Sequence, residues 1–164
     1  MDRETIVPWT VLPVDFETVL PVWQTKLWPG RVSPIRPVCP MMFLGGHDMN
    51  IITLYADQVK FFGVYNAAGD LAGVSSGHPT SETHYRNRGL HVDPSFDRQG
   101  IAHALLGAVV NAAVDAGRDV IWGLPRLPNV PFYIMHGWVE MSGPITEDVE
   151  FGPNIYMARP LAPF

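Results

Sequence analysis

Cysteine, charge and long apolar runs are scarce in this chain, and each scarcity excludes a class of protein. The single cysteine, Cys39, cannot form an internal disulfide, and no thiolate metal site can be built from it. Lys and Arg number 11 against 16 Asp and Glu, and this net charge of -5 argues against electrostatic wrapping of nucleic acid. No apolar run approaches the roughly 18 residues of a membrane span, and the first residues lack the layout of a signal peptide. We therefore expect a soluble, cytoplasmic protein without a nucleic-acid or membrane partner.

Apolar residues and prolines, in contrast, are plentiful. Hydrophobic residues make up 47% of the chain, which indicates an ordered core. Many of the 16 prolines fall between Pro8 and Pro40, so the N-terminal quarter is expected to be rich in loops. At about 100–200 residues per domain, 164 residues predict one domain spanning 1–164.

The spacing of apolar and turn residues predicts a mixed succession of elements. Strands are expected over residues 5–12, 60–65, 71–76, 83–92, 120–124, 138–141 and 155–159. Helices are expected over 15–27, with a kink at Pro21, and over 49–58, 98–116 and 130–136. The packing stripe of the long helix is predicted to be Ile101, Ala104, Leu105, Ala108, Val109 and Ala112. This order predicts an α/β domain of the α+β type and not a regular doubly wound sheet.

One strand–loop–helix segment carries a chemical signal. The strand ends at Val92, the helix opens near Arg98, and Gly100 and Ala102 leave little side chain at its first turn. Free backbone N–H groups and the positive end of the helix dipole meet there. Together they form an anion site suited to a pyrophosphate, which the small residues allow to approach closely.

This segment resembles motif A of the GNAT superfamily of N-acetyltransferases, in which a strand ending in Val runs into Gln/Arg-x-x-Gly-x-Gly/Ala. The matching residues are Val92, Gln99, Gly100, Ile101 and Ala102. Asp97 stands where the family has Gln or Arg, and Arg98 beside it can offset the charge. A second stretch, 129–138, resembles the family's Phe-Tyr-x-x-x-Gly-Phe segment, and Arg126 stands where an Asn is often found. The similarity covers roughly residues 60–160.

The resemblance implies a fold, a cosubstrate and a site. The fold would be a mixed, mostly antiparallel central sheet, splayed at the coenzyme site and flanked by helices. Residues 59–164 would form the coenzyme-binding core, and 1–58 the acceptor side. Acetyl-CoA would donate the acetyl group by direct attack in a ternary complex, without a metal. The coenzyme-binding residues would be Val92, Asp97, Arg98, Gln99, Gly100, Ile101, Ala102 and Asn129.

Tyr133 is the residue that the resemblance implies as the general acid for the departing thiolate. The base is open among Glu82, His78, His84 and His91, and we take His84 as the working candidate. Strand alternation puts His84, Arg86, Arg88, Leu90 and Val92 on one side, and Tyr85, Asn87 and His91 on the other. The spacing of the three histidines fits no common metal-ligand motif.

Arginines are conspicuous in a chain poor in charge. Arg86 and Arg126, with Trp28, are the candidate substrate-binding residues, because Arg favours bidentate contact with carboxylate or phosphate. The leading hypothesis is an N-acetyltransferase for a primary amine of a small molecule, with an acid group on the acceptor as one option. The alternatives are a protein or peptide N-acetyltransferase and a non-catalytic CoA-binding sensor domain. A homodimer is left open.

Overall fold

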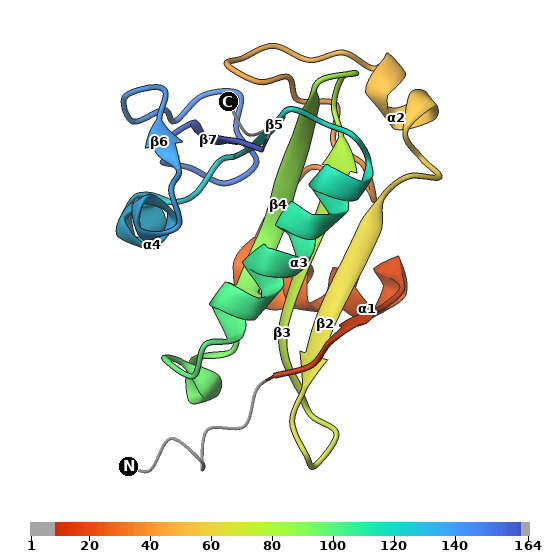
Figure 1. The fold of residues 1–164 in the computed structure, drawn as a ribbon, viewed down its shortest axis with the longest axis vertical. Helices are drawn as coiled ribbons and strands as arrows, with labels where there is room; N and C mark the ends of the chain where they lie inside the picture. The colour runs from red at the N-terminus through yellow and green to blue at the C-terminus, as the bar shows by residue number, and fades with distance from the viewer. Residues whose placement is uncertain (1–8, 162–164) are drawn as a thin grey trace.

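The computed structural model describes residues 9–161, which form a seven-stranded sheet flanked by helices (Figure 1). The strands are β1 (Val11–Pro13), β2 (Lys60–Tyr65), β3 (Leu71–Pro79), β4 (His84–Val92), β5 (Val120–Gly123), β6 (Val139–Glu140) and β7 (Met157–Pro160). Their order across the sheet is β1-β2-β3-β4-β5-β7-β6. Each neighbouring pair is antiparallel except β4 and β5. The predicted mixed, mostly antiparallel sheet is confirmed.

The helices cover both faces of this sheet. They are α1 (Phe16–Val22), the π-helical η2 (Trp23–Leu27), α2 (Asn50–Leu54), α3 (Ile101–Asp115) and α4 (Val130–Met135). Figure 1 shows α3 lying across β2, β3 and β4, with α1 on the opposite side of the sheet and α4 beside β6 and β7. Short 3-10 turns at Pro94–Phe96 and Leu127–Asn129 lead into α3 and α4.

The core beneath α3 depends on glycines in the strand below it. Ile101, Leu105 and Val109 of the predicted stripe are buried, as are Leu106 and Ala113, whereas Ala104, Ala108 and Ala112 are only partly covered. A Cβ on Gly73 would lie 3.0 Å from Ile101 and Leu105, and one on Gly77 would lie 2.7 Å from Val109. The helix can pack this closely only because β3 offers bare backbone at those two points.

The sequence predicted where α3 ends but not where it begins. The helix was expected from residue 98, but it begins at Ile101 because Arg98 and Gly100 both have positive φ, 60° and 83°. At the other end Gly117, with φ 71°, stops the helix as predicted, and the Arg118 N–H bonds back to the Ala113 carbonyl.

The N-terminal helix widens after the proline in its middle. Pro21 was expected to kink it, and the chain instead passes from α1 directly into the π-helical η2, where the Trp28 N–H donates to the Trp23 carbonyl. Asp15 occupies the N-cap position, but its side chain caps nothing. The first strand begins at Val11, and residues 5–8 of the predicted strand lie outside the described residues.

Candidate active site

Strands β4 and β5 diverge after a short shared ladder, and a cavity opens between them. They pair only at His84–Val120, Tyr85–Ile121 and Arg86–Trp122. Beyond that point lies a cavity of about 460 Å³. It is bordered by the second half of β4, the loop before α3, the β5–α4 connection, η2 and the loop between β6 and β7. The predicted splay next to Val92 is therefore present.

The loop before α3 forms one end of this cavity. Asp97 and Ala102 line it together with Val92. The first hydrogen bond of α3 runs from the Ala104 N–H to the Gly100 carbonyl, so the preceding N–H groups lack partners within the helix. A Cβ on Gly100 would meet nothing within 4 Å, so the space beside the helix start is open. These features fit a bound pyrophosphate at the start of a helix of 15 residues.

Asp97 makes a local contact within this loop. Its carboxylate accepts a hydrogen bond of 3.0 Å from the Arg98 N–H. On the other side of the loop, the Trp9 indole donates to the Gln99 carbonyl at 2.9 Å. The Asp97 side chain thus contacts the backbone of Arg98, the residue with a positive φ of 60°.

Tyr133 lies in the cavity wall with its hydroxyl in a chain of polar side chains. The Asn87 amide donates to the Tyr133 hydroxyl at 3.2 Å, and the Ser75 hydroxyl donates to the Asn87 carbonyl oxygen at 3.4 Å. Burial raises the pKa of Tyr133 to about 12, and the bond from Asn87 opposes that rise. Because the oxygen of Tyr133 already accepts from Asn87, its own proton is free for another acceptor.

A bulge in β4 exchanges the two sides of the strand and overturns the predicted alternation. Gly89 has φ 74°, and the register between β3 and β4 shifts there. Leu90 and Val92 consequently pack in the core beneath α3, on the side of Tyr85. By alternation from Leu90, His91 takes the side of Arg86 and Arg88.

The histidines separate accordingly, and the expectation that His84 faces the cleft is wrong. His84 lies at the far end of β4, against Phe43 and hydrogen-bonded to Thr83, and does not line the cavity. His91 does line it, and its buried Nε2 has no hydrogen-bond partner in the described structure. Burial is the main reason that the pKa of His91 is lowered from 6.5; nearby Asp93 opposes this, and Arg126 adds to it.

His78 and Glu82 are unsuited to proton transfer in this cavity. His78 is fully buried, its Nε2 accepts from the Cys39 N–H at 3.4 Å, and burial lowers its pKa to about 3. Glu82 is exposed and does not line the cavity.

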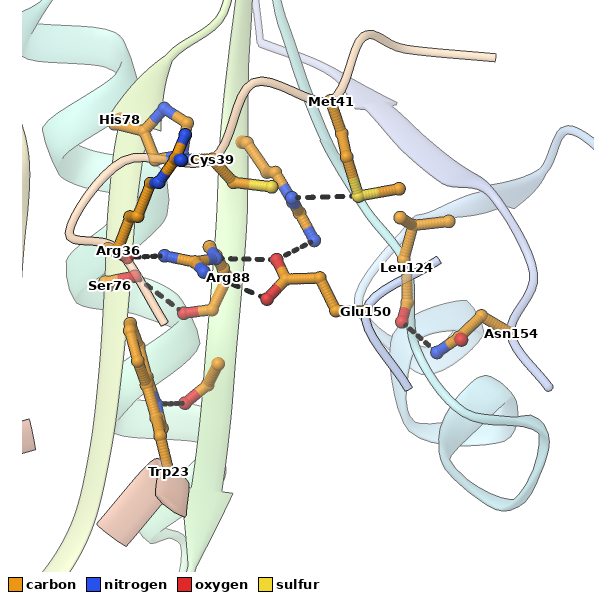
Figure 2. A network of polar contacts seen from close by, with 12 residues as sticks. Trp23, Arg36, Cys39, Met41, Ser76, His78, Arg88, Leu124, Glu150 and Asn154 are labelled. Carbon is orange, nitrogen blue, oxygen red and sulfur yellow. Dashed lines mark hydrogen bonds and ion pairs between the residues drawn. The ribbon is translucent and has the colours of Figure 1, made fainter. Parts of the chain in front are cut away.

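Glu150, in the loop between β6 and β7, forms ion pairs with three arginines at the cavity, and the sequence analysis did not single it out. Arg88 binds it in bidentate fashion, with Nε at 2.7 Å and Nη2 at 2.9 Å (Figure 2). Arg86 approaches within 3.1 Å, and Arg31 forms a third, shorter ion pair. Burial alone would raise the pKa of Glu150, but the guanidinium groups of Arg88 and Arg86 hold it well below its ordinary value.

The remaining predicted acceptor residues also reach the cavity. Trp28 lines it, with the guanidinium groups of Arg31 and Arg88 stacked on its ring at 5.1 and 5.3 Å. Arg126 lines it from the β5–α4 connection, and Asn129 follows at the start of α4. Eight of the predicted site residues therefore line the cavity: Val92, Asp97, Ala102, Asn129, Arg86, Trp28, Arg126 and Tyr133. The other predicted coenzyme-binding residues lie beside it where the loop enters α3: Arg98, Gln99, Gly100 and Ile101.

Comparison with known proteins agrees with this geometry. The model of the Acetyltransferase (GNAT) family matches residues 38–138. The chain belongs to this family. Its members transfer an acetyl group from acetyl-CoA, and this chain is accordingly an acetyltransferase that uses acetyl-CoA.

Solved structures share the GNAT fold at low sequence identity. A GNAT family acetyltransferase from Elizabethkingia anophelis, with acetyl-CoA bound, has a TM-score of 0.58 and 15% identity, over 93% of this chain and 98% of that one. A GNAT family acetyltransferase from Staphylococcus aureus has a TM-score of 0.63 and 14% identity, over 94% and 100%. The ribosomal-protein-S18-alanine N-acetyltransferase from Escherichia coli has a TM-score of 0.63 and 16% identity, over 96% of each chain. A comparison with curated protein sequences gave no match.

Across residues 9–161, no group of three or more His, Cys, Asp or Glu side chains is placed to hold a metal ion. In the same part of the chain, no helix combines the length and apolar character that crossing a membrane requires.

Proposed function

We propose that this GNAT enzyme acetylates a primary amine of a small molecule by direct attack in a ternary complex. The observation that carries the proposal is the closure of one end of the cavity, where η2 faces the β6–β7 loop; we call it the acceptor end. There the β6–β7 loop is pinned through Glu150 to Arg31 and to β4, and Phe151 packs on Arg126. A cavity walled in this way suits a small acceptor better than an extended peptide. Residues 26–28 line it, which supports an acceptor side within 1–58.

The polar groups of the cavity support two proton transfers. Acetyl-CoA supplies an activated thioester. The amine nitrogen forms a bond to the acetyl carbon as the carbon–sulfur bond breaks. His91, kept neutral by burial, accepts the amine proton, and Tyr133 donates its free proton to the departing sulfur. His91 replaces His84 in this role because only His91 borders the cavity.

The test is a thiol-release assay with the purified chain, acetyl-CoA and two panels, one of small amines and one of peptides with free N-termini or lysines. We expect turnover with at least one small amine and little with the peptides. Turnover confined to peptides would favour the protein N-acetyltransferase. Tight acetyl-CoA binding without turnover on either panel would favour the sensor domain. A homodimer and a cytoplasmic location stay predictions.

A further inference from the structure

Arg126 is a cation at the cavity without an acidic partner. One of its nitrogens donates to the Leu27 carbonyl, and its guanidinium group stacks on Phe151 at 4.7 Å. Within residues 9–161, no carboxylate lies within ion-pair distance of it. Partial burial lowers its pKa, and no counter-charge opposes that effect. Arg126 is therefore partly buried at the cavity wall, and most of its N–H groups are free.

The rest of the acceptor end has an excess of positive charge. Three arginines share the single carboxylate of Glu150, whose two oxygens each already have two guanidinium partners. Arg88 also donates to the Arg36 carbonyl, so it has no free group, whereas the Nε of Arg86 is buried without a partner. Glu150 therefore has nothing left to offer Arg126 or a ligand amine.

The position of Arg126 does not suit contact with the coenzyme phosphates. The fitting pyrophosphate site is the loop before α3, whereas both partners of Arg126 belong to the acceptor end, Leu27 in η2 and Phe151 in the β6–β7 loop. Arg126 and His91 both line the same cavity of about 460 Å³, so one small ligand can contact both side chains.

We propose that the acceptor amine carries a carboxylate and that Arg126 binds this carboxylate while the amine faces His91. The inference rests on the proposed function and narrows its substrate class to amino acids. A guanidinium group with free N–H groups matches a carboxylate in bidentate geometry. Since amine and carboxylate are close together in an amino acid, neighbouring residues can hold both.

The experiment compares matched pairs of acceptors, each an amino acid and the amine that remains when its carboxylate is removed. Thiol release from acetyl-CoA gives kcat/KM for both members of each pair. We expect the wild-type protein to favour the best amino acid over its amine by about 10- to 100-fold, the range for a hydrogen bond to a charged group. Arg126→Gln should remove this preference by lowering kcat/KM for the amino acid alone, mainly through KM.

Two further variants sharpen the result. Arg126→Lys keeps the charge but loses the planar pair of donors, so it should retain part of the preference. Lys60→Gln removes one positive charge from an exposed position of β2 outside the cavity and should leave the preference unchanged. Unchanged acetyl-CoA affinity in Arg126→Gln shows that the coenzyme site is intact.

Three outcomes would overturn the inference. They are equal kcat/KM for both members of every pair, a higher kcat/KM for the amine than for its amino acid, and loss of acetyl-CoA affinity in Arg126→Gln. Each of them leaves small-amine acetylation itself standing. Failure of the proposed function has a different signature, since no small amine would then release thiol in any pair.

Discussion

The hydroxyl of Tyr133 is the single atom on which the proposed thiolate protonation depends. Tyr133→Phe keeps the buried ring and removes only the proton donor, so kcat should fall by about 10²- to 10⁴-fold while acetyl-CoA affinity barely changes. The measurement is steady-state thiol release together with calorimetric titration of the coenzyme. Tyr156→Phe is the matched control, because the Tyr156 hydroxyl bonds to the Met42 carbonyl away from the cavity. Full turnover in Tyr133→Phe would remove the residue from the mechanism.

His91 lines the cavity and His84 does not. The pH profile of activity tests which of the two is the base. A base must be unprotonated, and burial lowers the pKa of His91 below 6.5. Activity should therefore rise as pH increases through that lowered pKa and should be level by neutral pH. His91→Gln should lower the plateau by about 10²-fold or more and abolish this acidic limb. His84→Gln should change neither, and the reverse pattern would return the role to His84.

At the scale of elements, the bulge in β4 aims His91 into the cavity. A Cβ on Gly89 would lie 2.3–2.4 Å from the ring of Trp23, and its φ of 74° disfavours other residues. Gly89→Ala should therefore lower the free energy of unfolding by about 1–3 kcal/mol or more, measured by urea denaturation.

Gly107 provides the matched control for that substitution. It lies exposed within α3, and a Cβ there would meet nothing within 4 Å. Gly107→Ala should raise the free energy of unfolding by about 0.5–1 kcal/mol, because Ala is the better helix former. Equal effects of the two substitutions would contradict the account of the bulge.

The loop before α3 should be sensitive to a negative charge. Gly100→Glu would add a carboxylate beside the pyrophosphate site, so acetyl-CoA affinity should fall by about 100-fold. Gly100→Asn adds no charge and tolerates the positive φ of 83° better, so it should cost much less. Calorimetry on both variants checks this, and unchanged affinity in a folded Gly100→Glu protein would exclude the loop as the phosphate site.

The sequence could predict a structural feature when the residues that determine it are close together along the chain. The strand Lys60–Tyr65 was predicted with its observed bounds, since alternation and the following turn are both local signals. The loop that leads from β4 into α3 was predicted in the same way, from Gly100 and Ala102 beside a helix, and its binding of the coenzyme stays a prediction. Gly89 was also visible, since a glycine inside a strand pattern can mark a bulge. Strict alternation without a bulge placed His84 on the same side as Val92, and His84 therefore became the candidate base.

Glu150 illustrates the other case. It lies in a short acidic stretch after a proline and glycine turn, which is typical of an exposed loop. Its partners Arg88 and Arg31 are 62 and 119 residues away along the chain. A contact of this kind has no local signature, so only the folded chain reveals it.

For the whole molecule, the Glu150 cluster joins three distant parts of the chain. Glu150→Gln would leave the buried Arg86 and Arg88 and the half-buried Arg31 without a counter-ion, and it should lower the free energy of unfolding at pH 7 by about 3–5 kcal/mol. The exposed Glu147→Gln is the matched control and should change it by less than about 0.5 kcal/mol. Similar unfolding curves for the two variants would contradict this role.

The pH dependence of that stability has a definite sign. The folded-state pKa of Glu150 is depressed, so its contribution is fully present above the pKa of an unfolded glutamate, about 4.3. It is lost as pH falls from there through the folded-state value. The difference between wild type and Glu150→Gln should therefore shrink in acid, below about pH 4.

The contacts that close the acceptor end also set an order of events during synthesis. A ribosome delivers the chain from its N-terminus, so β2, β3, β4 and α3 are available before residue 150 has been made. The pyrophosphate loop can thus take shape on a nascent chain whose acceptor wall does not yet exist. The Arg31–Glu150 and Leu27–Arg126 contacts span 119 and 99 residues, and such non-local contacts form slowly. The site for the donor should mature first, and the site that selects the acceptor should form last.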